Sequence, residues 1–360
     1  MNHCMRSFDN ETLVTSPVSS ISGTVVLLLA ALIGIPGNVF IIWSILWKMR
    51  GKEKSVTCIL ILNLAVADGT VLILTPFFIT FLIMRTWVFT RVTCKIVYYL
   101  ACVNMFASIF IITLMSLDRL LAISRPYMVQ SIRKKHVARK VLLGIWVAAM
   151  LLSIPAFVYR EVVEEASTKR LICEPCHPSS HHTISHYSLE TVVAFLVPLV
   201  IISTSYALIL QKLKATKFRR RIRTEKLILA IVLSFIVLWL PYHVVNAIQV
   251  ASRVATGNMA EKLKHAWKAS RALATTLAII SFSINPVLYA FAASNFIRVF
   301  GMNFIVKLFE GTVGELHRRT RSQKDLEKDF INDVSKGAES QEFNRDNTLD
   351  ISHSTKLPQA

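Results

Sequence analysis

The sequence lacks the marks of an enzyme, a transporter and a cleaved secretory leader. Its first twenty residues have neither the charged start nor the apolar core of a signal peptide, so we expect the first apolar segment to direct insertion. No loop joins a nucleophile to a base in a recognisable arrangement, which argues against an enzyme. No inverted repeat of broken helices or ring of pore charges indicates a transporter or channel.

Apolar residues make up 53% of the 360 residues and the mean hydropathy is +0.51, more than a soluble domain needs for its core. They gather into segments long enough to cross a bilayer as tilted helices, without the alternation of membrane β-strands. The segments cover residues 21–47, 56–84, 94–124, 137–159, 187–212, 224–251 and 269–294. A soluble protein would need seven successive helices without a polar face. The sequence therefore predicts a membrane bundle.

Charge is unevenly shared, with 41 Lys and Arg against 22 Asp and Glu and a formal net charge of +19. The basic residues cluster in short connections at 48–54, 125–140 and 212–223, a distribution that argues against nucleic-acid binding. Cytoplasmic loops are enriched in Lys and Arg. We therefore expect a multi-pass plasma-membrane protein with its N-terminus extracellular and its C-terminus cytoplasmic. A glycosylation sequon at Asn10 agrees with this orientation.

The segment 94–124 begins with Cys94 and closes with an acid–base pair, Asp118 and Arg119. Oxidised cysteines belong to extracytoplasmic faces, so the Cys94 end should lie outside. After the bundle, which spans 21–294, apolar residues recur at helical spacing and predict an amphipathic helix on the inner leaflet at 295–310. The polar remainder, 311–360, is predicted to be a disordered cytoplasmic tail, and residues 1–20 an extracellular arm.

Four cysteines fall on the predicted outer side: Cys4, Cys94, Cys173 and Cys176. An even number in an oxidising space favours two disulfides. A Cys94–Cys173 bond would join the third segment to the second outer loop, and Cys4–Cys176 would pin the arm, although Cys176 can also take the place of Cys173. A zinc site is the alternative, because four histidines lie within 177–186. Oxidised cysteines would give zinc no thiolate.

Asp68 lies within the second segment, where a carboxylate costs at least about 2.5 kcal/mol and needs a partner or a wet cavity. Ser108, Ser281 and Asn285 offer polar partners in the third and seventh segments. These residues could hold a sodium ion through their oxygens, and a structural hydrogen-bond cluster is the alternative. Prolines interrupt the last three segments and predict kinks. They are Pro198, Pro241 and Pro286.

Residues in every segment, in order over 21–310, resemble the rhodopsin-like G-protein-coupled receptors. They are Gly37-Asn38, Leu64 with Asp68, Cys94 with Asp118-Arg119, Trp146, Pro198 with Tyr206, Phe235 with Trp239 and Pro241, and Asn285-Pro286-Val287-Leu288-Tyr289. Within that family, four stretches look like the leukotriene B4 receptor subfamily, without indicating a subtype. They are Ala31–Asn38, Ala156–Arg160, Trp239–Asn246 and Leu308–Gly311.

The resemblance implies an allosteric receptor for a heterotrimeric G protein of inhibitory type, with arrestin and receptor kinases acting at the tail. Asp118 would restrain Arg119 at rest, and an outward swing of the sixth segment would let Arg119 reach Tyr206 and Tyr289. The other implied switch residues are Phe235, Trp239, Asn285 and Pro286. Many relatives also hold this arginine with an acid at the start of segment six. Here that stretch, 219–223, is basic, which puts the second restraint in doubt.

An acidic lipid ligand needs a cation for its carboxylate and polar groups for its hydroxyls. Arg160 and Arg271 are predicted to bind the carboxylate, unless they only snorkel to the interface. Glu190 and His186 share a helix face and are predicted to meet a hydroxyl or an arginine, with an internal salt bridge as the alternative. The remaining candidates are Tyr98, Tyr242, His243 and Asn246 for hydroxyls and Trp239 for an apolar floor.

The sequence thus predicts an all-α membrane protein, a seven-transmembrane helix bundle with a short amphipathic eighth helix. The predicted function is a receptor for leukotriene B4 or a related hydroxy fatty acid in chemotaxis and inflammation. Membrane lipid surrounds it, and no cofactor is expected beyond an allosteric sodium ion. A peptide or chemokine receptor is the first alternative, and the outer arginines argue mildly against it because such ligands usually need an acidic face. A transporter or channel is the alternative from another class.

Overall fold

Helices account for almost all of the chain that the computed structural model describes, which is residues 17–48, 56–124, 135–165, 169–215 and 222–300. These residues belong to one unit of the chain, 1–309. The helices are α1 (Pro17–Trp43), α2 (Val56–Ile73), α3 (Thr75–Met84), α4 (Arg91–Ser124), α6 (Lys135–Leu152), α7 (Ile154–Tyr159), α8 (Ser180–Thr191), α9 (Val197–Ala215), α10 (Ile222–Val254) and α11 (Gly257–Phe300). Two π-helical turns, η2 (Ser44–Lys48) and η3 (Val192–Leu196), continue α1 and α8.

Within the described residues, seven helical segments are long and apolar enough to cross a membrane, which confirms the predicted bundle. Two of them begin at least seven residues before the apolar runs, at Ser180 instead of 187 and at Gly257 instead of 269. The added turns carry polar residues such as His181 and Lys264. Hydropathy marks only the part of a helix that lies in hydrocarbon, so polar turns beyond it escape notice.

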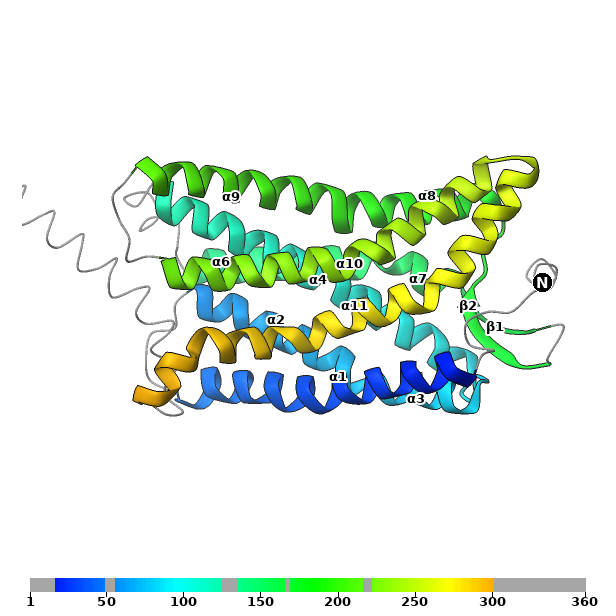
Figure 1. The fold of residues 1–360 in the computed structure, drawn as a ribbon, viewed down its shortest axis with the longest axis horizontal. Helices are drawn as coiled ribbons and strands as arrows, with labels where there is room; N and C mark the ends of the chain where they lie inside the picture. The colour runs from blue at the N-terminus through cyan, green and yellow to red at the C-terminus, as the bar shows by residue number, and fades with distance from the viewer. Residues whose placement is uncertain (1–16, 49–55, 125–134, 166–168, 216–221, 301–360) are drawn as a thin grey trace, which may run out of the picture. The chain divides into compact units, whose positions relative to one another are not determined.

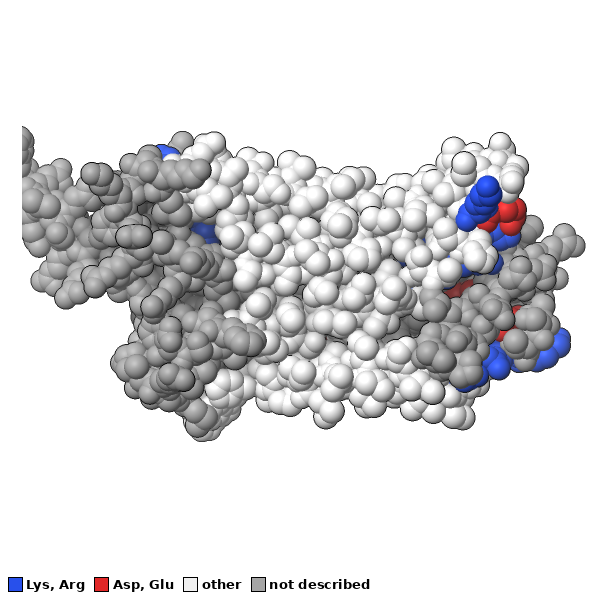
Figure 2. Space-filling view, in the orientation of Figure 1, with Lys and Arg blue, Asp and Glu red and all other residues white. Residues whose placement is uncertain are grey.

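The outside of the bundle is apolar. Leu32, Val200 and Val237 expose 69%, 64% and 64% of their surface, whereas Asp68 and Asn38 are buried inside. Figure 2 shows charged side chains gathered near one end of the described part and a charge-free band across the middle of the visible face. This distribution is the one expected of a protein whose middle is surrounded by lipid.

Helix α4 lies at the centre of the bundle, as the sequence suggested for the segment that begins near Cys94. It packs against α2, α6, α7, α9 and α10 (Figure 1). Its inward positions are filled by Ile109, Ile111 and Ile112, each almost completely buried. Because α4 touches so many neighbours, a change at one of its ends can reach most of the bundle.

Helices α1 and α11 approach each other closely around Pro286. A Cβ atom at Gly37 would lie 2.5 Å from the Cβ of Pro286, so only glycine fits there. Proline removes the hydrogen bond that the carbonyl four residues earlier would accept. Here that carbonyl belongs to Phe282, and the side-chain amide of Asn38 donates to it at 3.2 Å. A polar side chain of α1 therefore compensates the proline of α11.

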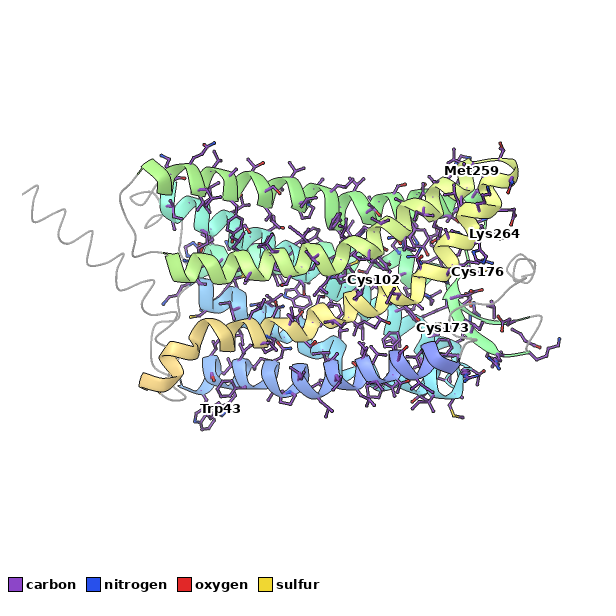
Figure 3. The ribbon with its side chains drawn as sticks, viewed as in Figure 1. Trp43, Cys102, Cys173, Cys176, Met259 and Lys264 are labelled. Atoms are coloured by element: carbon purple, nitrogen blue, oxygen red, sulfur yellow. A yellow bond between two sulfur atoms is a disulfide. The ribbon has the colours of Figure 1, made fainter. Side chains whose placement is uncertain are left out.

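A β-hairpin that the sequence did not predict covers one end of the bundle, here called the hairpin end. Its strands, β1 (Arg160–Glu164) and β2 (Leu171–Pro175), are antiparallel. The Cys94–Cys173 disulfide joins β2 to α4, which confirms that pairing over the alternative with Cys176. The backbone N–H of Trp87 also donates to the carbonyl of Leu171 at 2.7 Å. Figure 3 places Cys173 and Cys176 at this end.

The ends of the described chain lie at opposite ends of the bundle. Helix α1 starts at the hairpin end and α11 runs to Phe300 at the other (Figure 1). Residues 17–20 of the predicted arm belong to α1, and residues 295–300 of the predicted eighth helix continue α11. Residues 1–16 with Cys4 and Asn10, residues 301–310 and the tail 311–360 lie outside the described residues. These remain predictions.

Candidate ligand-binding site

Arg160 is a partly buried cation at the hairpin end whose hydrogen bonds are not filled. It begins β1, and its guanidinium carbon lies 3.6 Å from the ring centre of Tyr98 on α4. One terminal nitrogen donates to the carbonyl of Cys173 at 3.3 Å. Its Nε is buried and has no hydrogen-bond partner within the described part of the chain. A cation held by a ring, with donors to spare, is suited to receive an anion.

Arg271, the second predicted cation, is instead held by side-chain amides. It donates to Oδ1 of Asn246 and to Oε1 of Gln249, both on α10. The amide nitrogen of Asn246 donates in turn to Oε1 of Glu190 at 2.9 Å. Asn246 thus bridges a carboxylate on α8 and a guanidinium on α11. The unbroken chain Glu190–Asn246–Arg271–Gln249, here called the amide network, satisfies charges that burial would otherwise penalise.

His186 stands at the edge of the amide network. Its Nε2 lies 3.7 Å from Oε2 of Glu190, as the shared helix face predicts. Its Nδ1 lies 2.9 Å from Nε2 of His177, so one of the two nitrogens carries the shared hydrogen. Burial lowers the pKa of His177 to about 3, with the neighbouring cationic groups adding to the effect. His177 is therefore neutral at ordinary pH.

Aromatic rings form the layer beneath the amide network. Trp239 stacks on Phe235 at 5.5 Å and meets the ring of Tyr242 edge-on at 5.6 Å. His243 stacks on Phe195 at 4.8 Å, and its Nδ1 lies 3.4 Å from Oγ1 of Thr191. The Nε2 of His243 is buried without a hydrogen-bond partner among the described residues. This nitrogen is available to a hydroxyl group.

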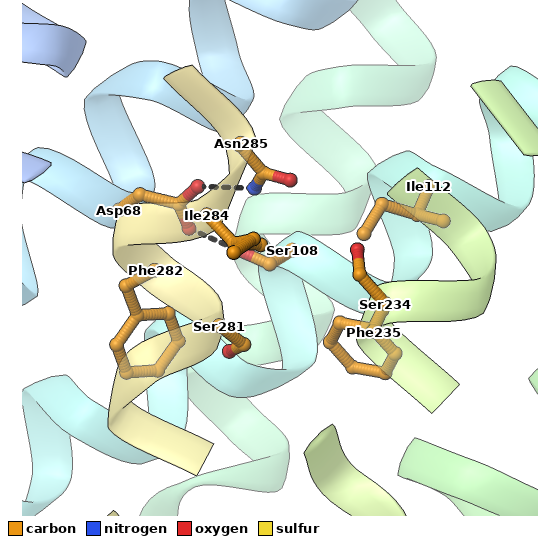
Figure 4. A pocket seen from close by; sticks show the side chains of 9 residues that line it. All are labelled: Asp68, Ser108, Ile112, Ser234, Phe235, Ser281, Phe282, Ile284 and Asn285. Carbon is orange, nitrogen blue, oxygen red and sulfur yellow. Dashed lines mark hydrogen bonds between the residues drawn. The ribbon is translucent and has the colours of Figure 1, made fainter. Parts of the chain in front are cut away.

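A polar cluster around Asp68 lies below Trp239. Oδ1 of Asp68 accepts from Ser108 at 3.1 Å and Oδ2 accepts from Asn285 at 2.7 Å (Figure 4). Ser281 lines the same cleft and accepts a hydrogen bond from Nε1 of Trp239 at 3.0 Å. The cleft has no room for a water-sized sphere. The donors suit a hard cation in kind, and seating one requires Asn285 to turn its amide.

Arg119 lies buried near the end opposite the hairpin. Its terminal nitrogen NH2 donates to Oγ1 of Thr57 on α2 at 2.5 Å and lies 3.9 Å from Oδ2 of Asp118. The predicted pairing with Asp118 is therefore a loose contact, and Thr57 provides a shorter one. Tyr206 is buried on α9. The side chain of Tyr289 lies outside the described residues.

Ion pairs fasten the hairpin to α4. Glu161 accepts from Arg91, which lowers the pKa of the Glu161 carboxyl, and from Lys95 at 2.9 Å. Lys95 also donates to the carbonyls of Phe157 and Val158 at the end of α7. Burial raises the pKa of Glu174 to about 7, although Arg160 opposes the shift. The hairpin thus favours the ionised form of Glu161 and the protonated form of Glu174.

The zinc alternative gains no support. Cys173 and Cys176 are both disulfide-bonded, so neither offers a thiolate. Across residues 17–300, outside the gaps given above, no group of three or more His, Cys, Asp and Glu is arranged to hold a metal ion.

The structure joins some of the predicted residues and leaves others apart. Glu190, Asn246, Arg271 and His186 form one group, and Trp239, Tyr242 and His243 lie beneath it. Arg160 and Tyr98 form a second group. Sequence reasoning missed Gln249, although it lies one helical turn after Asn246. It also missed Thr57, for which the sequence holds no signal.

These features define a helical membrane receptor, and the comparison with protein families agrees. The model of the 7 transmembrane receptor (rhodopsin family) matches residues 37–289. The chain belongs to this family of G-protein-coupled receptors, which are not enzymes.

Individual relatives within this family show which receptors the chain is similar to. The chain is 40% identical over 328 residues to human leukotriene B4 receptor 2, covering 90% of each. It is 42% identical over 301 residues to human leukotriene B4 receptor 1, covering 82% of this chain and 84% of the relative. The C3a anaphylatoxin chemotactic receptor of Oncorhynchus mykiss is 32% identical over 295 residues, covering 79% and 78%.

Proposed function

We propose that this receptor binds leukotriene B4 or a closely related hydroxy fatty acid at the hairpin end and passes the signal to a heterotrimeric G protein of inhibitory type. The observation that carries the proposal is the unfilled, ring-supported guanidinium of Arg160 beside a buried amide network. The similarity to leukotriene B4 receptors over 90% of the chain supports it.

The carboxylate of the ligand is assigned to Arg160 rather than Arg271. Both cations lie close enough to His186 and Tyr187 to act on them electrostatically, so they serve one region. Arg271 already donates to two amide oxygens, whereas Arg160 keeps a buried donor without a partner in the described chain. A carboxylate that binds at unfilled donors gains new hydrogen bonds. It breaks none of the hydrogen bonds that already exist in the protein.

The hydroxyl groups of the ligand are assigned to the layer below. Nε2 of His243 is free to donate or accept, and Glu190 offers carboxylate oxygens. Tyr242 and Tyr98 supply phenol groups beside them. A site that hydrogen-bonds hydroxyls discriminates strongly against chains that lack them, because its polar groups are then left buried and unpaired.

Transmission starts at Trp239, because it touches both the binding layer and the Asp68 cluster. Its ring contacts Tyr242 and its Nε1 donates to Ser281, which lines the Asp68 cleft. A ligand that displaces Trp239 favours a second state of α10, the kinked helix that holds Pro241. At the far end, release of Arg119 from Thr57 would open the G-protein site, with Tyr206 and Tyr289 as its new partners.

A sodium ion at Asp68, Ser108, Ser281 and Asn285 would stabilise the resting state. These residues offer a carboxylate, hydroxyls and an amide, which are oxygen donors of the kind hard cations prefer. The alternative, a purely structural cluster, needs only the two hydrogen bonds already present. Sodium would favour the state in which Asn285 turns its oxygen toward the cleft.

The receptor is a multi-pass membrane protein, and we infer the plasma membrane with the hairpin end outside. Basic connections at 48–54, 125–140 and 212–223 support a cytoplasmic opposite end. This orientation places the agonist site outside and Arg119 inside. Arrestin and receptor kinases would then act at the tail.

The proposal is tested by nucleotide exchange in reconstituted membranes. Leukotriene B4 should accelerate exchange on an inhibitory-type Gα and leave stimulatory-type Gα and ion flux unchanged. Exchange driven by a C3a-type peptide but not by the lipid would refute the ligand assignment. Exchange on the stimulatory type alone would refute the G-protein assignment.

A further inference from the structure

A second hollow opens on the side of the bundle, between the end of α7 and the first turns of α8. Its volume is about 210 Å³. Its lining includes Tyr159 and Leu189 together with three histidines, His181, His182 and His186. Of the described residues, neither Arg160 nor Arg271 lines it, so the hollow differs from the place assigned to the agonist carboxylate, and it shares His186 with the edge of the amide network.

An exposed apolar strip leads away from this hollow. Ser185, Leu189, Val192 and Leu196 follow one another along α8 and η3 at the spacing of one helix face, and all four are exposed. In a membrane bundle such side chains face lipid. This surface is thus polar at the hairpin end and apolar toward the middle of the bundle. Its polarity matches that of a lipid with a polar headgroup and a single acyl chain.

The histidines make the polar end suited to an anionic headgroup. Nδ1 of His182 is bonded to Oγ of Ser179 at 2.8 Å, which leaves the other ring nitrogen for a ligand. The rings of His182 and His186 pack around Tyr159, at 5.9 and 5.7 Å. Within the described part of the chain, no acidic side chain lines the hollow. An anion therefore meets donors there and no opposing carboxylate.

We propose that this hollow binds the carboxylate of a fatty acid from the surrounding membrane, with the acyl chain lying along the strip of Leu189, Val192 and Leu196. A complete ligand pocket has about 300–1,000 Å³, so a hollow of 210 Å³ takes only the headgroup and the first carbons. The rest of the chain stays in lipid.

Occupancy of the hollow acts on the agonist site through His186. This side chain lines the hollow, and its Nε2 lies 3.7 Å from Glu190 of the amide network. A carboxylate that attracts His186 draws it from Glu190 and so changes the bonding of Asn246. Coupling between two sites is reciprocal, so agonist binding also changes the affinity for the fatty acid.

Photolabelling of the full chain in lipid nanodiscs tests the site. The probe is stearic acid with a mid-chain diazirine, and labelled peptides are mapped by mass spectrometry. We expect saturable labelling within 180–196 that oleic acid displaces and oleyl alcohol does not. Labelling spread evenly over all lipid-facing helices, or displaced equally by the alcohol, would overturn the proposal.

Two variants and a control sharpen the test. Ser185→Trp fills the hollow and His182→Leu removes a donor while keeping bulk, and each should weaken labelling about tenfold. Leu32→Trp, at an exposed position on α1, should leave it unchanged. If Ser185→Trp fails to fold, as shown by loss of the Cys94–Cys173 peptide, His182→Leu decides alone. Unchanged labelling in His182→Leu contradicts the site, and since no agonist is present, that failure leaves the proposed function untouched.

Discussion

Replacement of Asn246 by leucine should destabilise the receptor more than any other single amide change at the hairpin end. Asn246 is fully buried, donates to Glu190 and accepts from Arg271, so Asn246→Leu breaks two hydrogen bonds to charged groups at similar side-chain volume. Each such bond contributes about 1.5–3 kcal/mol. Because Arg271 and Glu190 can partly relax toward each other, we expect a loss near the lower end of the sum, about 3 kcal/mol.

Gln249→Leu is the matched control. It removes one bond from the same Arg271 and leaves the carboxylate of Glu190 with its amide partner. Its cost should be about half as large. A loss of about 3 kcal/mol lowers the unfolding temperature by roughly 6–12 °C for a domain of 150–250 residues, and we expect a shift of that order for Asn246→Leu.

Thermal unfolding of the purified, ligand-free receptor can be followed with a thiol-reactive dye. The thiol of Cys58 is buried, so it becomes reactive when the bundle opens. If Asn246→Leu unfolds at the temperature of the wild type, or no lower than Gln249→Leu, the amide network does not stabilise the fold as described.

Three further changes have defined outcomes. Thr57→Val removes one acceptor of Arg119 and should raise basal nucleotide exchange up to about tenfold, and unchanged basal exchange would contradict the restraint. Glu174 has its pKa raised by burial from 4.5 to about 7, so the folded state binds an extra proton and stability falls as pH rises from 4.5 through 7. Glu174→Gln should flatten that part of the stability curve, and a curve of unchanged slope would count against this burial effect. Asp68→Asn should abolish the effect of sodium on agonist affinity, and a retained sodium effect would place the ion elsewhere.

The sequence was most informative where lipid constrains the choice of residues. Helices that cross hydrocarbon must be apolar along their length, so seven of them could be recognised in the printed sequence. Topology placed Cys94 on the same side as Cys173 and Cys176, and the structure selects Cys173 as its partner. The polar cluster around Asp68 could be predicted because a carboxylate in a membrane segment needs partners. Ser108 and Asn285 supply them.

Structure outside the hydrocarbon could not be predicted in the same way. The hairpin of Arg160–Glu164 and Leu171–Pro175 mixes apolar and charged residues without strict alternation, and it is joined to α4 by a disulfide and an ion pair that no local pattern reveals. The polar first turns of α8 likewise could not be predicted from hydropathy, because they hold few apolar residues. Thr57 meets Arg119 only through the packing of α2 on α4, a contact between residues 62 positions apart. Such tertiary contacts have no local sequence pattern.

The central claim is that the guanidinium of Arg160 receives the carboxylate of an acidic lipid agonist, and a double-mutant cycle tests it most directly. Binding of leukotriene B4 and of its uncharged methyl ester is measured for the wild type, for Arg160→Ala and for Arg253→Ala, an exposed arginine at the same end. Loss of a charged hydrogen bond predicts about 10- to 100-fold weaker binding of the acid to Arg160→Ala, no change for the ester and none for Arg253→Ala. Equal weakening of acid and ester in Arg160→Ala would contradict the claim.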